Sequence, residues 1–316
     1  MKKPTIRIPK LVSIALIALA GCIVASCGGG DESSSLEGSA SLRWPRPALD
    51  DPTTVELDTG YTLTDLDPEE DYIVKLPSTK KVGATVLVGG HDILIVGGAI
   101  TIPKGTSSDA ERRGIYIKGA TGTVHVEGVL IDGSGGAEFD GVAIAAPEAT
   151  VQLQNMRIVG VRGGYDTFHG DVVQPWGGVK DLRIDHLTGT SDYQGLTVME
   201  ELGPIGSTEI SNVDITTTES PMPRHLAGGY MLWLTTDNCD SYPVHLSEVY
   251  ITPRPGRTLG TSVWPPSRSP RFPCHAEVDT KATWPNLPVT GGVKEGPAPT
   301  SAVPEGAAGI GYEAPG

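Results

Sequence analysis

Residues 151–158 have the sequence VQLQNMRI, a pattern of residue types that occurs six times along the chain. In each block alternate residues are mostly apolar, then a polar or glycine pair breaks the alternation before it resumes. A period of two is typical of a half-buried β-strand, so each block predicts a strand, a sharp corner and a second strand. The blocks are separated by steps of 31, 27, 31, 26 and 36 residues and lie at residues 93–100, 124–131, 151–158, 182–189, 208–215 and 244–251.

A second series of short segments lies between these blocks, and its members begin at Gly114, Gly141, Val172, Gly195 and Gly229. Three short strands per repeat, with no helical periodicity between them, can bury their apolar faces only by coiling and stacking. The composition agrees with a turn-rich all-β fold, because the chain has 41 Gly, 26 Pro and only 5% aromatic residues. A β-sandwich is the alternative, and the near-constant spacing of the segments disfavours it.

The repeat and its corner residues resemble the right-handed parallel β-helix of the pectate-lyase-like superfamily, over roughly residues 54–252. Asn155 and Asn212 stand where that superfamily often stacks an asparagine ladder, whereas His186 and Glu248 depart from it. The resemblance implies an all-β solenoid of three-strand coils over residues 54–253. It also implies a functional site on the face that the second series of segments forms.

The first 27 residues predict a lipoprotein-type signal peptide, because basic residues precede an uncharged apolar run at residues 11–25. That run is short for a helix that spans a bilayer. Cys22 and Cys27 each end a segment that resembles the lipobox of bacterial lipoproteins. We favour lipidation at Cys27, because the Gly/Ser-rich and then Pro-rich residues 28–53 that follow it are typical of a flexible linker. We expect an exported protein that lipid anchors to the bacterial cell envelope, with a cleaved, secreted protein as the alternative.

The charge of the chain restricts its partners. The formal net charge is −14, and it becomes −18 when the four basic residues within residues 1–26 are removed. Such an acidic surface argues against nucleic acid as a partner. It would also repel acidic polysaccharides unless a bound cation or a local basic cleft intervenes.

Two cysteines, Cys239 and Cys274, lie beyond the signal. In an oxidising compartment they could form a disulfide, and two unpaired buried thiols are the alternative. Residues 254–316 are rich in Pro, Gly and Ser, and we expect an irregular segment that packs on the last coil near Cys274 and is otherwise loose. Trp264 and Trp284 in this segment are predicted to be packing anchors.

The segment HGDVVQPW, residues 169–176, places polar residues in a strand that is aliphatic or small in the neighbouring repeats. In a functional interpretation His169 is a general base or acid, and Asp171 orients it or binds a cation. Gln174 would donate hydrogen bonds to a sugar, and Trp176 with Trp233 would stack on a pyranose ring. The alternative is a structural polar ladder, in which Asp171 caps loop amides and a backbone carbonyl satisfies His169.

The alternation also predicts which residues of the second series face outward. If Ile115, Val142, Val173, Leu196 and Tyr230 face inward, two outward columns result. One column is Tyr116, Ala143, Gln174, Thr197 and Met231, and the other is Lys118, Ala145, Trp176, Met199 and Trp233. Long loops flank this face and predict a cleft, to which we assign Lys118, Arg162 and Tyr165 as further substrate-binding residues. Arg224 and His225 lie in the later loop.

A metal site is a second hypothesis. Asp140, Asp171 and Asp192 fall at nearly matching positions of three successive coils. Stacked carboxylates would repel one another unless they are hydrated or bridged by a hard cation such as Ca²⁺. An unoccupied acidic rim is the alternative. Among the other histidines, we expect His186 to be structural and His91, His125 and His245 to lie at the surface.

These features predict a monomeric cell-envelope protein that acts on an extracellular polysaccharide. The leading reaction is a lyase-type β-elimination on a uronic-acid-containing chain, in which His169 removes the C5 proton. The alternative from another class is a non-catalytic carbohydrate-binding or envelope scaffold protein. A third candidate is a glycoside hydrolase that uses Asp171 with Glu200.

Overall fold

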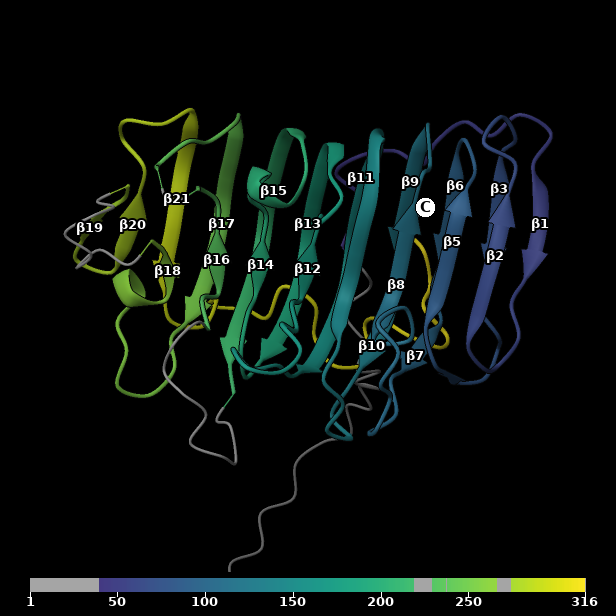
Figure 1. Ribbon diagram of the computed structural model, residues 1–316, viewed down its shortest axis with the longest axis horizontal. Coiled ribbons are helices and arrows are strands. Elements are labelled where there is room, and N and C mark those ends of the chain that lie inside the picture. Colours follow the sequence, from purple (N-terminus) through teal and green to yellow (C-terminus); the bar gives the residue numbers. More distant parts are fainter. Residues whose placement is uncertain (1–39, 219–228, 237, 266–273, 316) are drawn as a thin grey trace, which may run out of the picture. The chain divides into compact units, whose positions relative to one another are not determined.

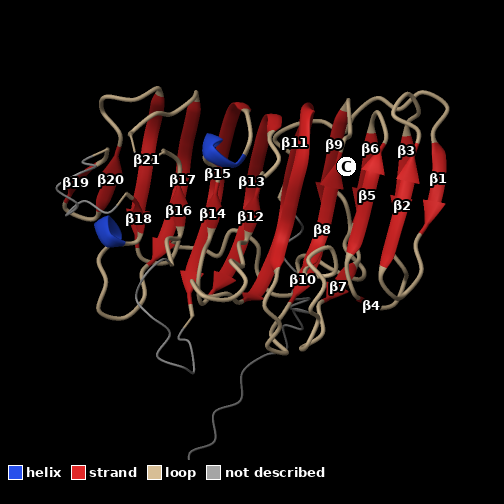
Figure 2. Cartoon of the chain, viewed as in Figure 1, coloured by secondary structure: helices blue, strands red, loops and turns tan. Residues whose placement is uncertain are grey.

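The computed structural model describes residues 40–218, 229–236, 238–265 and 274–315, all within one unit, Glu37–Gly316. These residues form a parallel β-helix, in which almost every strand pairs in parallel with the equivalent strand of the next coil (Figure 1). Within the described residues helix is limited to two short 3₁₀ turns, η1 (Glu200–Leu202) and η2 (Leu259–Thr261) (Figure 2). The predicted fold class is confirmed.

The strands divide into two stacks that follow the two series in the sequence. The stack that carries the second series consists of β2 (Thr62–Leu66), β5 (Thr85–Gly89), β8 (Arg113–Lys118), the start of β11 (Asp140–Val161), β12 (Val173–Gln174), β14 (Leu196–Thr197), β16 (Leu232–Trp233) and β18 (Val263–Trp264). The blocks and their flanks form β1 (Thr53–Glu56), β3 (Tyr72–Lys75), β4 (Lys81–Val82), β6 (Ile93–Val96), β7 (Ala99–Thr101), β9 (Thr123–Glu127), β10 (Leu130–Asp132), the rest of β11, β13 (Val179–Ser191), β15 (Ile205–Thr217), β17 (Val244–Thr252) and β21 (Val289–Glu295).

The register of the blocks is the predicted one, residue for residue. The first residue of each block pairs with the first residue of the next, in the order Ile93, Val124, Val151, Leu182, Thr208 and Val244. The third residue of each block therefore stacks inside the coil, and these side chains are at most 2% exposed: Ile95, Val126, Leu153, Ile184, Ile210 and Leu246. This inward column is part of one continuous apolar core.

The fifth residue of every block forms the corner, and its backbone has a left-handed conformation. The φ angles lie between 50° and 66° at Gly97, Gly128, Asn155, His186, Asn212 and Glu248. Glycine and asparagine tolerate this region, which explains four of the six corners. The two asparagines do not stack on each other. Asn155 Nδ2 donates to Ala40 O at 2.8 Å, and Asn212 Nδ2 donates to Asp185 Oδ1 at 2.8 Å.

The described part of the predicted linker packs against the β-helix. The side-chain amide of Gln154 accepts from the backbone amides of Arg43 and Trp44 and donates to Trp44 O at 2.9 Å. Arg46 forms an ion pair with the fully buried Glu127. We call residues 40–53 the strap. His125 is fully buried next to the same glutamate, and its ring nitrogens lie 2.8 Å from Glu127 Oε2 and from the Gln152 amide. The prediction that His125 lies at the surface is therefore wrong, and residues 40–53 are not a free linker.

The C-terminal segment is more ordered than its composition predicts. Beyond residue 253 it adds β18 and β21 to the stacks, and β19 (Ala276–Val278) and β20 (Lys281–Thr283) pair antiparallel beside them. The following residues return along the corners toward the earlier coils, as the yellow trace in Figure 1 shows. There Asn155 Nδ2 donates to the Tyr312 hydroxyl at 3.0 Å. The prediction of an irregular, loose segment is wrong for the described residues.

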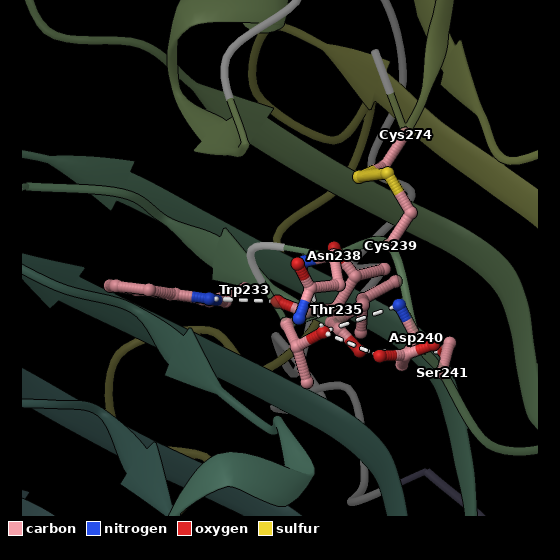
Figure 3. The surroundings of a disulfide bond; sticks show 9 residues. Trp233, Thr235, Asn238, Cys239, Asp240, Ser241 and Cys274 are labelled. Atoms are coloured by element: carbon pink, nitrogen blue, oxygen red, sulfur yellow. Dashed lines mark hydrogen bonds between the residues drawn. A yellow bond between two sulfur atoms is a disulfide. The ribbon is translucent and has the colours of Figure 1, made fainter. Parts of the chain in front are cut away.

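Cys239 and Cys274 form a disulfide with a Cα–Cα distance of 5.2 Å (Figure 3). The bond joins the loop that follows β16 to the segment that precedes β19. Trp284 is 1% exposed and packs in the core, as predicted for a packing anchor.

Replacing Gly128 by alanine is expected to destabilise the protein by more than replacing Gly119 by alanine. Both glycines have positive φ, 66° and 60°, so both variants carry the left-handed penalty of about 1–2 kcal/mol. A Cβ at Gly128 would also collide with the ring of Tyr312, whereas at Gly119 the nearest atom is 4.0 Å away. Displacing the C-terminal segment should add about 1–3 kcal/mol. Urea unfolding measures both, and equal losses would show that Tyr312 does not hold this segment.

Candidate functional site

The outward side chains of the second stack form the predicted face, with one correction. The pairing runs from Tyr116 through Ala143, Gln174 and Thr197, and the next coil contributes Trp233. The predicted alignment placed Met231 there and made Tyr230 the inward residue. Instead Leu232 pairs with Leu196 and faces the core, so Trp233 joins the column of Gln174, and Trp264 follows it.

A groove with a volume of about 350 Å³ opens on this face. Its walls come from the loop before β12, from β12, β14 and η1, and from β16 and β18. It is lined by Tyr165, His169, Gln174, Tyr193, Gln194, Thr197, Met199, Leu202, Tyr230, Trp233 and Trp264. The structure thus brings together His169, Gln174, Tyr165 and Trp233 of the predicted site.

Three aromatic rings build one end of the groove. The ring centroids of Tyr230 and Trp264 are 4.6 Å apart, those of Trp233 and Trp264 are also 4.6 Å apart, and those of Tyr230 and Trp233 are 5.8 Å apart. Trp233 is fixed further because its indole Nε1 donates to Thr235 O at 3.0 Å (Figure 3). Rings held in such contact form a rigid apolar surface that needs little ordering when a ligand binds.

His169 stands at the other end of the groove, exposed, between two tyrosines. Its ring centroid is 6.1 Å from that of Tyr165 and 5.5 Å from that of Tyr193. His169 Nε2 lies 3.0 Å from Tyr165 O. A carbonyl oxygen can only accept, so this bond places a proton on Nε2 and leaves Nδ1 of the neutral ring as the basic nitrogen. Burial raises the pKa of Tyr193 to about 12, which keeps its hydroxyl protonated.

Asp171 lies beneath the groove rather than in it. Its side chain is 0% exposed, and its Oδ1 accepts a hydrogen bond from Thr197 Oγ1, while Oδ2 has no hydrogen-bond partner among the described residues. Its backbone N–H donates to Oδ1 of the equally buried Asp140 at 3.0 Å, and Asp140 Oδ2 lies 3.4 Å from Arg113 Nε. The pair therefore forms a buried acidic layer under the strands.

Burial disfavours the charged form of both carboxyl groups. It raises the pKa of Asp140 to about 7, although Arg113 opposes the shift. Burial, and then the charge of Asp140, raise the pKa of Asp171 well above its ordinary value. A groove-facing catalytic or cation-binding role for Asp171 has no geometric support, because the side chain is fully buried and does not line the groove.

Several predicted site residues lie elsewhere. Trp176 and Lys118 are on the same face but do not line the groove, and Trp176 packs toward Tyr116 at a centroid distance of 6.2 Å. Arg162 is engaged with Asp192, with 3.1 Å between Nε and Oδ2. Arg224, His225 and the lipidation candidates Cys22 and Cys27 lie outside the described residues.

The carboxylates proposed to bind Ca²⁺ do not converge. Asp192 accepts from Arg162 and from the backbone of Gly163, away from the Asp140–Asp171 pair. In the described part of the chain, one set of three side chains has ligand atoms within 4.8 Å of one another: Asp71, His91 and Asp92. The Asp71 carboxylate already accepts hydrogen bonds from the backbone amides of Asp50 and Asp92 and contacts His91. These contacts indicate that the carboxylate has a structural role at a corner of the chain.

Several groove residues were not predicted as ligand contacts, among them Tyr193, Leu202, Tyr230 and Trp264. Asp171 and Gln194 occupy equivalent strand entrances in successive coils, so Tyr193 is equivalent to Gly170. Aligning the strand entrances could therefore have placed Tyr193 beside the groove. Trp264 was assigned to packing because its strand, β18, lies in the segment predicted to be irregular.

A second cavity, of about 430 Å³, lies between the corner residues and the C-terminal segment. Its charged groups are satisfied within the protein. His186 Nδ1 lies 2.6 Å from Asp185 Oδ2, as expected for a structural histidine, and Lys294 pairs with Glu248 at 2.8 Å. The groove instead offers polar groups with no partner in the described structure, notably the Gln174 amide, and we take the groove as the candidate site.

Comparison with protein-family models, curated proteins and solved structures returned no match. Within the described residues, no helix is long and apolar enough to cross a membrane.

Proposed function

We propose that the protein binds a polysaccharide chain in the groove. The mutually packed rings of Tyr230, Trp233 and Trp264 carry this proposal. A pyranose ring has an apolar face and a rim of hydroxyl groups, so it complements a groove that combines flat aromatic surface with free polar groups. Gln174 and His169, which line the same groove, provide such groups.

The proposed setting is the outside of a bacterial cell. The apolar run at residues 11–25 and the lipobox-like segment that ends in Cys27 support export and lipid anchoring. The Cys239–Cys274 disulfide supports an oxidising compartment. The left-handed corners and the groove on the second stack favour membership of the pectate-lyase-like superfamily. We propose a monomer, and the net charge of −14 argues against nucleic acid as its ligand.

Replacing Trp233 by alanine is expected to weaken polysaccharide binding by about 30-fold or more. The loss removes one of three interlocked rings, and a buried aromatic anchor contributes about 2 kcal/mol or more to binding. Isothermal titration with the polysaccharide that binds tightest in a panel of neutral and acidic glycans measures this loss. Tyr61→Ala, which removes an exposed ring outside the groove, is the control and should bind as the unchanged protein does. Equal affinity for Trp233→Ala would refute the groove as the site.

A second candidate function is cleavage by β-elimination, and the hydrogen bond from His169 Nε2 to Tyr165 O favours it. In a bound uronic-acid residue, Nδ1 would take the C5 proton. The electron pair would form the C4–C5 double bond, the C4–O bond would break, and the leaving oxygen would take a proton from water. Gln174 would donate hydrogen bonds to the uronate carboxylate. These bonds draw electron density toward the carboxylate and make the C5 proton more acidic. The glycoside hydrolase candidate is less suited to this geometry, because Asp171 does not reach the groove.

His169→Ala is expected to abolish cleavage while changing saccharide affinity by less than about threefold, because general base catalysis contributes about 10²–10⁴-fold. Ultraviolet absorbance of the unsaturated product, followed with each polyuronate of the panel, measures the reaction. Reducing ends without absorbance would indicate hydrolysis. Binding without any product would remove the lyase and leave the binding protein.

A further inference from the structure

A second group of aromatic and cationic side chains lies on the same face, outside the groove. Trp176 is 39% exposed, and its ring is 6.2 Å from that of Tyr116. The Arg113 guanidinium lies 4.7 Å from the Tyr116 ring centroid and 5.6 Å from that of Trp176. Lys118 Nζ lies 5.5 Å from the Tyr116 ring. We call these four residues the Trp176 patch.

The patch has one uncompensated positive charge. Arg113 faces the buried Asp140 carboxyl, but the exposed Lys118 ammonium makes no ion pair within the described residues. Trp176 offers an exposed indole, and the exposed Lys118 ammonium lies over the neighbouring Tyr116 ring. Together they complement a ligand that has both a flat apolar face and an anionic group.

The patch and the groove lie on one line. Tyr116 and Trp233 occupy the same outward column, four strand spacings apart, with Ala143, Gln174 and Thr197 between them. Four spacings of about 4.8 Å give about 19 Å. Ala143, between them, is itself fully buried, so its side chain does not stand above the surface there. An extended glycan parallel to the β-helix axis can therefore contact both.

We propose that the Trp176 patch is a second subsite for the same polysaccharide. One sugar stacks on Trp176 while a carboxylate or sulfate on that part of the chain pairs with Lys118, and the sugars toward the other end occupy the groove. At about one sugar per strand spacing, the bound segment has about five or six sugars. This inference rests on the proposed function, and it assigns the ligand to the acidic glycans.

The test compares three-sugar and six-sugar fragments of polygalacturonate, alginate, hyaluronate and chondroitin sulfate by isothermal titration. The six-sugar fragment of the best ligand should bind at least tenfold more tightly than the three-sugar fragment. In Trp176→Ala this gain should disappear while the affinity for the short fragment is unchanged. Lys118→Gln should lower the affinity for the long fragment several-fold and reduce its dependence on salt.

Two outcomes would overturn the inference. One is equal loss, or no loss, for both fragment lengths in Trp176→Ala. The other is binding of neutral glycans only, which would leave the proposed groove function intact. Trp233→Ala separates the two proposals, because it should weaken both fragment lengths. Trp176 and Lys118 are exposed, and an unchanged urea midpoint would confirm that the variants fold.

Discussion

Asp171→Asn should make the protein more stable than the unchanged chain at pH 8 and leave the two nearly equal at pH 4. In the folded protein, burial holds the pKa of Asp140 at about 7 and that of Asp171 well above its ordinary value. The folded state therefore binds more protons than the unfolded state between about pH 4 and pH 7, and stability falls as pH rises through that window. The loss is on the order of 2–4 kcal/mol.

Asparagine at position 171 removes one ionisable group and its repulsion of Asp140, and its side-chain oxygen can still accept from Thr197. The difference in unfolding free energy between variant and unchanged protein should thus grow with pH. Urea unfolding at several pH values measures it. Asp166→Asn, a change of an exposed carboxyl in the neighbouring loop, is the control and should leave the pH dependence as it is. If the unfolding free energies of Asp171→Asn and of the unchanged protein changed with pH in parallel, the buried pair would not be the source of the pH dependence.

Removing the disulfide by Cys239→Ser with Cys274→Ser should cost about 2–4 kcal/mol of unfolding free energy. The bond closes a loop with a sequence separation of 35, so its loss gives the unfolded chain considerable freedom. The loop also includes Trp264, whose ring packs on Trp233. We therefore expect weaker polysaccharide binding as well as lower stability.

Reduction of the unchanged protein with dithiothreitol should reproduce both losses, which separates the bond from any effect of the serine side chains. A stability change below about 1 kcal/mol in the double variant would show that the neighbouring strands hold this end of the β-helix without the bond.

The repeats and their register could be predicted from the sequence alone. A slip by one residue would turn Ile184 or Ile210 outward, so the alternation fixes the pairing wherever one face is buried. The corner residues were predictable for the same reason, since the break in the alternation coincides with the left-handed residue at Asn155 and Asn212.

The error at Tyr230 has a physical cause. A shift of two residues preserves the alternation, so the pattern cannot distinguish Tyr230 from Leu232 as the partner of Leu196. The long connection before this strand gave no fixed spacing. Trp233 was consequently assigned to the column of Trp176, which joined the groove and the Trp176 patch into one predicted cleft.

Long-range packing accounts for the remaining differences. His125 alternates as a surface residue, but it is fully buried and contacts Glu127, which pairs with Arg46 of the distant strap. The order of the C-terminal segment depends on contacts with coils far back in the sequence, such as that of Tyr312 with Asn155. Asp171 occupies a polar strand entrance, and its burial follows from the layer that it forms with Asp140 of the preceding coil.

The most direct test of the central claim is a crystal structure of the protein with the oligosaccharide that binds it most tightly. We expect sugar rings in the groove, stacked on Trp233 and Trp264, with hydroxyl or carboxylate groups near Gln174 and His169. A saccharide bound elsewhere, for example between the corner residues and the C-terminal segment, with the aromatic rings left uncovered, would contradict it.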